Sequence, residues 1–166
     1  MSLQFEFQLA FNFVEDLPTA VVQTLEFLTG QRTDPPAEWP DPENAFIQSD
    51  AARAPLLSAL TQGEPNCGDN ICSFRRVFRY CWADHDVYQY TFHFRCLWHD
   101  DDFYHTWWVL VPWLAKYSDA DGYVGFYKEQ FTKHPTLIYF QKGDVYFREV
   151  LEPPVPFVDG KVWDSG

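Results

Sequence analysis

Four side chains able to bind a metal ion fall within about two helical turns of one another. They are His99, Asp101, Asp102 and His105. Asp101 and His105 have the i, i+4 spacing that would let both reach one ion. Three consecutive aspartates are also favoured at a helix N-terminus without any ligand, because they cap free N–H groups and interact well with the helix dipole. We prefer this second explanation and expect no metal site.

Cysteine spacing suggests a second potential metal or redox site. Cys67 and Cys72 have four residues between them, which zinc coordination or a disulfide would allow. No Cys-x-x-Cys pair accompanies them, and Cys81 and Cys96 fall within strand patterns, where a tetrahedral zinc cage is hard to close. We therefore expect reduced thiols, with a Cys67–Cys72 disulfide kept as the alternative.

No motif in the chain indicates catalysis or nucleotide binding. The sequence contains no G-x-S-x-G, no G-x-G-x-x-G and no G-x-x-x-x-G-K. Asp84, His85 and Asp86 have acid–base side chains, but they lie at a predicted hairpin tip, where such residues are usually solvated. We expect neither catalytic residues nor a cofactor, and we favour a non-enzymatic role.

A group of polar side chains on the predicted sheet has the composition of an anion site. Two predicted strands, Cys72–Trp82 and Val87–Trp98, place arginine and histidine opposite their aromatic face. With a carboxylate from the first strand, the group is Glu6, Arg75, Arg79, His93 and Arg95. Arginine binds carboxylate or phosphate through two parallel hydrogen bonds, so the group could hold a small anionic ligand. Pairing with the chain's own carboxylates, or cover from the C-terminal strands, also explains the pattern, and we favour this structural explanation.

Composition restricts the partners. The 166 residues include 24 acidic and 12 basic side chains, and the net charge of -12 repels nucleic acids and anionic membranes and favours a basic protein partner. Aromatic residues make up 19%, more than a small core needs, so we expect some of them at a contact surface. No signal peptide follows Met1, and the longest apolar run, Trp107–Ala115, is too short to cross a membrane. We expect a cytoplasmic protein.

The first half of the chain is predicted to begin with a strand and a helix. Residues Gln4–Val14 alternate apolar and polar side chains, which is typical of a half-buried strand. A helix follows, with Asp16 as its N-cap. The segment Gln31–Asp50 contains four prolines and predicts an irregular surface excursion held by Trp39 and Phe46.

The middle of the chain is predicted to form a hairpin. A short helix is expected around Pro55–Leu60, ahead of the two central strands. In the register that keeps one face apolar, the first of these strands turns four side chains inward. They are Phe74, Phe78, Tyr80 and Trp82, while Arg76 is the exception that this register leaves pointing inward.

A long helix and three strands are predicted for the rest. The helix runs from about Asp101 to Tyr117 and contains Pro112, which predicts a kink or a split. The strands that follow are Gly122–Glu129, Thr136–Gln141 and Asp144–Val150.

The long helix is apolar on nearly all sides, which is unusual for a helix on the surface of a small domain. Its far side is therefore expected to be covered by a second copy of the chain, through Trp108, Val109 and Trp113. If the protein is a monomer, the cover must come from the Pro-rich segment or from the C-terminal tail.

The order of elements predicts a ferredoxin-like α+β fold. Its split β-α-β layout has an antiparallel sheet, two main helices on one face and a C-terminal strand extension. Residues 1–151 are expected to form a single α+β domain, and residues 152–166 a Pro-rich C-terminal tail.

The chain resembles a family of uncharacterised bacterial proteins of similar length. The resemblance rests on the strand and helix within Phe5–Leu28 and on four shorter segments: Trp39–Pro42, Val111–Leu114, Gly122–Glu129 and Pro135–Phe140. At the joint before the long helix, Cys96–Asp100 replaces an asparagine- and lysine-rich sequence of the family. The family implies no activity, so the resemblance supports the topology alone.

Charge, aromatic content and the absence of catalytic motifs together predict a non-enzymatic, acidic protein-binding module of the immunity or antitoxin-like kind. The alternative is a small-molecule-binding sensor or enzyme of the dimeric α+β barrel type. In that architecture two sheets face each other and enclose an anionic ligand near His93 and Arg95.

Overall fold

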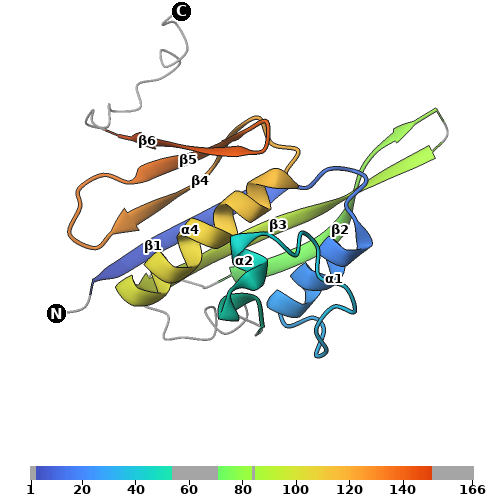
Figure 1. Cartoon of the computed structure of the whole chain (residues 1–166). Coiled ribbons are helices and arrows are strands. Elements are labelled where there is room, and N and C mark those ends of the chain that lie inside the picture. Colours follow the sequence, from blue (N-terminus) through green and yellow to red (C-terminus); the bar gives the residue numbers. More distant parts are fainter. Residues whose placement is uncertain (1–2, 54–70, 84, 151–166) are drawn as a thin grey trace, which may run out of the picture.

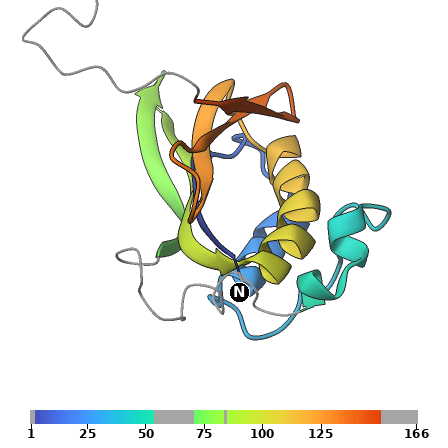
Figure 2. The same ribbon diagram turned by 90° about the vertical axis from the view of Figure 1, so that its left-hand side faces the viewer.

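The described part of the protein consists of a six-stranded antiparallel sheet and several helices (Figures 1 and 2). The computed structural model describes residues 3–53, 71–83 and 85–150. The strand order in the sheet is β2-β3-β1-β4-β5-β6, and all neighbours are antiparallel. The elements are β1 (Gln4–Asn12), α1 (Thr19–Leu28), α2 (Ala45–Gln48), the 3-10 helix η1 (Asp50–Arg53), β2 (Ile71–Trp82), β3 (His85–His99), α4 (Asp100–Lys116), β4 (Gly122–Glu129), β5 (Thr136–Gln141) and β6 (Asp144–Glu149). The predicted α+β class is therefore confirmed.

Strand β1 lies between β3 and β4 and joins the two halves of the sheet. Its alternating sequence places Phe5, Phe7 and Leu9 on the buried inner face and leaves polar residues on the outer face. Phe7 lies opposite Cys96 on one side and Tyr127 on the other. Full burial of one such side chain contributes roughly 1.5–3 kcal/mol, so β1 is a main source of the core's stability.

Helix α4 packs across the inner face of the sheet (Figure 2). Phe103 stacks on Phe5 with ring centroids 4.1 Å apart, and Trp107 meets Phe7 edge to face at 4.8 Å. Pro112 lies within the helix and is exposed, and α4 continues without interruption to Lys116. The split predicted at this proline is therefore absent. No helix among the described residues is long and apolar enough to cross a membrane.

Two local predictions were wrong. Helix α1 begins at Thr19 with Pro18 as its N-cap and has no side-chain capping bond, so Asp16 does not cap it. In β2, a bulge separates Phe78, which pairs with Tyr88, from Tyr80, which pairs with Val87. A bulge adds one residue to a strand and reverses the faces beyond it, so Tyr80 lies on the outer face. The helix predicted at 55–60 and the tail at 152–166 lie outside the described residues.

Candidate functional site

The outer face of the sheet brings together most of the predicted anion group. Arg95 lies opposite Gln8 of β1, and His93 lies opposite Ala10. Arg75 of β2 lies one strand further out, opposite Thr91. Four of the five predicted residues, including Glu6, therefore share this face. The fifth, Arg79, falls at the bulge, outside the regular pairing of β2 with β3.

Within this group, the strongest contact is internal. Arg95 Nη2 lies 2.8 Å from Glu6 Oε1, and both side chains are largely shielded from solvent, at 32% and 26% exposure. Lys128 of β4 lies opposite Glu6 on its other side. A carboxylate of the chain thus lies between two cations, so this geometry supports a structural ion pair more than an anion cradle.

The group of potential metal ligands before α4 is only partly described. His99, Asp100 and Asp101 place one ligand atom each within 4.8 Å of one another, whereas the side chains of Asp102 and His105 lie outside the described set. Asp100 already accepts hydrogen bonds from the backbone N–H of Leu3 and of Asp101, and His99 Nδ1 lies 2.7 Å from its Oδ1. The Asp100 carboxylate, at the start of α4, is thus already bonded to other groups of the protein.

The three described thiols differ in burial. Cys72 is half-buried, Cys81 is exposed and Cys96 is buried, while Cys67 lies outside the described residues. Burial raises the pKa of the Cys72 thiol to about 12. Cys72 therefore stays protonated at neutral pH and is a poor nucleophile.

The three predicted interface residues on α4 lie in different environments. Trp108 is 57% exposed, Val109 is half-buried, and Trp113 is fully buried. Trp113 packs against Phe46 of α2, with ring centroids 5.4 Å apart. The far side of α4 is thus covered at this point from within the chain, by the Pro-rich segment, so Trp113 is excluded from any exposed interface.

That segment carries an exposed group of carboxylates. Residues 34–50, here called the acidic segment, contain five acidic residues and no Lys, Arg or His. Asp34, Glu38, Glu43 and Asp50 are exposed, and only Asp41 is half-buried. The segment therefore presents a local negative charge next to α4.

Two aromatic anchors hold the acidic segment against the helices. Trp39 meets Phe27 of α1 edge to face at 6.4 Å, and the guanidinium of Arg53 lies 4.5 Å from the Trp39 ring centroid. Phe46 is fully buried within α2. Asn44 caps this short helix, because its Oδ1 accepts a 2.9 Å hydrogen bond from the backbone N–H of Phe46.

Asp41 provides a third, polar anchor. Lys116 Nζ at the end of α4 lies 2.6 Å from Asp41 Oδ1, and the hydroxyl of Tyr117 donates a hydrogen bond to Asp41 Oδ2. Burial opposes ionisation of Asp41, but these two hydrogen bonds and the charge of Lys116 outweigh it and lower its pKa. Burial, then the bond to the carboxylate and its charge, raise the pKa of Tyr117. Asp41, Lys116 and Tyr117, here called the Asp41 clamp, therefore contribute a carboxylate, an ammonium group and a neutral phenol.

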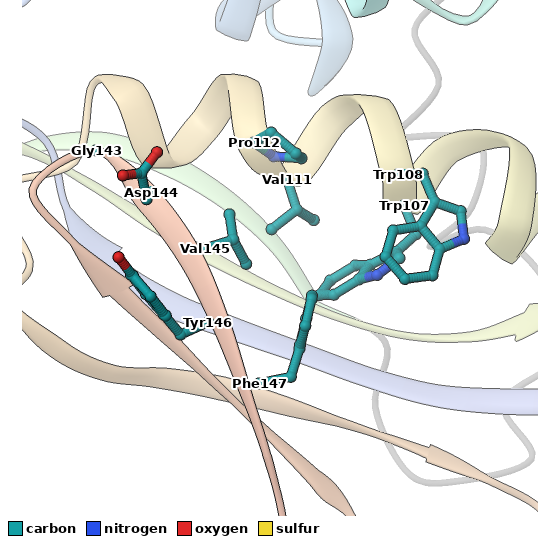
Figure 3. A pocket seen from close by; sticks show the side chains of 9 residues that line it. All are labelled: Trp107, Trp108, Val111, Pro112, Gly143, Asp144, Val145, Tyr146 and Phe147. Atoms are coloured by element: carbon teal, nitrogen blue, oxygen red, sulfur yellow. The ribbon is translucent and has the colours of Figure 1, made fainter.

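A second candidate surface is the groove between α4 and β6 (Figure 3). It has a volume of about 420 Å³, and its apolar walls include Trp107, Trp108 and Pro112 from the helix and Val145 and Phe147 from the strand. The ring of Phe147 extends toward the two indoles, with centroids 5.6 Å from Trp107 and 6.1 Å from Trp108. The sequence pattern identified Trp108 but not β6 as its neighbour, because nothing local indicates where the last strand is placed.

Comparison with protein-family models, with curated proteins and with solved structures found no match for this chain.

Proposed function

We propose that this protein is a non-enzymatic protein-binding module and that its acidic segment docks a basic partner protein. The observation that supports this function is a run of exposed carboxylates held in place by three anchors. Asp34, Glu38, Glu43 and Asp50 are exposed, and no basic residue interrupts them. An immunity or antitoxin-like role is one form of such a module.

Anchoring matters because binding orders flexible groups at a cost. Each immobilised side chain or loop residue consumes part of the interaction free energy, and a segment that is already held in position avoids much of that cost. Trp39, Asp41 and Phe46 supply this preorganisation. Clustered charge also speeds encounter with an oppositely charged surface, and the net charge of -12 acts in the same direction.

The alternative function, binding of a small anion on the outer sheet face, has weaker support. Arg95 is already paired with Glu6 at 2.8 Å. Neither His93 nor Arg95 lines the groove between α4 and β6 or any of three other hollows of the described residues. A face whose arginine is held in an internal ion pair suits a structural role better than small-molecule capture.

We also infer a ferredoxin-like core with a split β-α-β layout. The order β2-β3-β1-β4 supports this inference, with α1 between β1 and β2 and α4 between β3 and β4. Strands β5 and β6 then form the C-terminal extension. The dimeric α+β barrel would require the outer faces of two such sheets to pack together.

Matched charge reversals test the docking surface. NMR titration with a panel of Lys/Arg-rich peptides at about 0.15 M salt should shift the amides of the acidic segment. Asp34→Lys with Glu43→Lys should weaken this binding by about tenfold or more. The control, Asp86→Lys with Asp121→Lys, makes the same charge change at exposed positions elsewhere and should weaken binding by less than about threefold. Equal losses of affinity in the two double variants would show that binding depends on net charge alone, and would refute the proposal.

A third variant separates charge from preorganisation. Trp39→Ala removes the contacts with Phe27 and Arg53 but leaves every carboxylate in place. We expect a further weakening of about threefold or more, provided that circular dichroism shows a folded protein. Unchanged affinity would mean that the anchors do not contribute to recognition.

A further inference from the structure

The edge of the sheet at β6 combines two features that folded domains normally avoid. In the part of the chain that the structure describes, β6 pairs only with β5, which leaves the backbone groups along its other edge without strand partners. Three large apolar side chains are exposed beside this edge: Trp108 at 57%, Tyr146 at 50% and Phe147 at 42%. Such an edge is a template for pairing with another strand.

We propose that this edge is a homodimer interface in which β6 pairs antiparallel with β6 of a second copy. Residues that lie opposite each other in an antiparallel pair point to the same face of the sheet. The two-fold axis must therefore pass between the two copies of one residue, so that each residue lies opposite one that is an even number of positions away in the sequence. In the register centred on Tyr146, this tyrosine faces its own counterpart. Val145 faces Phe147 of the second copy, and Asp144 faces Arg148.

Charge complementarity favours this register, and it favours a second copy of the chain as the partner of β6. Asp144 and Arg148 are both exposed, and their cross-strand neighbours on β5 are Gln141 and Leu137, which carry no charge. In the proposed pairing each meets an opposite charge, and the two-fold axis makes two such pairs. The register centred on Phe147 would instead place Glu149 opposite Val145. The strand is thus complementary to itself, which argues for a second copy over an unrelated partner.

The same arrangement would also cover the groove between α4 and β6. A two-fold axis perpendicular to the sheet keeps the helices of both copies on one side, so the two grooves meet across the axis. Val145 and Phe147 of each copy then extend the apolar floor, beside Trp108 and Pro112. The acidic segment stays free for a partner, because α2 and β6 lie on opposite sides of α4 (Figures 1 and 2). This inference is therefore independent of the proposed function.

The test is a charge swap measured by sedimentation equilibrium on the full chain over about 1–100 μM, the range in which interfaces of modest size associate. Wild type should be dimeric. Asp144→Arg or Arg148→Asp alone places like charges opposite each other twice and should raise the dimer Kd by about tenfold or more. The double variant Asp144→Arg/Arg148→Asp restores both pairs in reversed sense and should recover the dimer.

Two further variants complete the design. Trp108→Lys should weaken the dimer through the groove, whereas Phe78→Ser, which alters an exposed aromatic residue on β2 at the opposite edge of the sheet, should not change the dimer Kd. A wild-type monomer at 100 μM, as expected if another part of the same chain or a different protein occupies the groove, overturns the proposal. A dimer that tolerates either single charge reversal, or a double variant that stays monomeric, overturns the proposed register and with it the argument for a second copy.

Discussion

Arg95 Nη2 donates a 2.8 Å hydrogen bond to Glu6 Oε1 and so links the outer faces of β3 and β1. The two residues are diagonal neighbours, since Arg95 faces Gln8 and Glu6 faces Leu97 in the pairing of the strands. Both side chains lose part of their hydration in this position. A half-buried pair of this kind contributes more than a solvent-exposed one, and removal of one partner leaves the other poorly compensated.

A double-mutant cycle measures this pair. Arg95→Ala and Glu6→Gln should each lower the free energy of unfolding by about 1–2 kcal/mol, and the double variant should lose less than the sum, with a coupling of about 0.5–1 kcal/mol. Urea unfolding provides the values.

Titration of wild type with millimolar sulfate or phosphate should leave the His93 and Arg95 resonances unmoved. Saturable shifts there, with Arg95→Ala costing less than about 1 kcal/mol, would instead establish an anion site.

The Asp41 clamp should make stability depend on acid pH. Since its folded pKa is lowered, ionised Asp41 contributes stability above the unfolded value of about 3.9. That contribution is lost as the pH falls through the folded pKa. Asp41→Asn should therefore cost about 1 kcal/mol at pH 7 and almost nothing near pH 2. Asparagine suits the test because it tolerates the positive φ of 48° at this position. Urea unfolding at both pH values measures the difference in unfolding free energy between wild type and the variant. A difference that persists near pH 2 would show that packing, not ionisation of Asp41, causes the effect.

Gly125 should be irreplaceable for steric reasons. A Cβ at this position would lie 1.9 Å from the backbone oxygen of Gln8, so β4 could not keep its distance from β1. Gly125→Ala should lower the free energy of unfolding by about 3 kcal/mol or more. Gly122 is a matched control, because its φ of 151° is close to the 159° of Gly125 but no atom lies within 4 Å of its Cβ position. Gly122→Ala should cost about 1 kcal/mol, and equal costs would show that the backbone angle, not the contact, is limiting.

Much of the sheet follows from local sequence. Alternation predicted β1, and the predicted strands 122–129 and 136–141 have the same bounds in the structure. For β1 the period alone was sufficient, because one face of this strand is buried and the other is not. The shared face of Glu6, His93 and Arg95 followed from the same reasoning, since adjacency of the first and third strands sets which side chains lie together.

What the sequence did not reveal depends on contacts between distant residues. The cover over Trp113 comes from α2, a helix of four residues that is too short to produce a periodic pattern. The clamp joins Asp41 to Tyr117, 76 residues apart, and no local pattern predicts such a contact. The bulge after Phe78 also left no clear signal, so the inward positions predicted beyond it were wrong at Tyr80.

That bulge has a consequence for how β2 and β3 open. Beyond the pair Thr91 and Asn12, where β1 ends, the two strands project as a narrow ribbon (Figure 1). Two strands alone are marginally stable. The ribbon can therefore fray from its tip while the core stays closed, and its amides should exchange with solvent first. The bulge places Tyr80 on one side of the ribbon and keeps the pair Phe78 and Tyr88 on the other. A frayed ribbon thus offers no continuous apolar strip to other molecules, which limits aggregation.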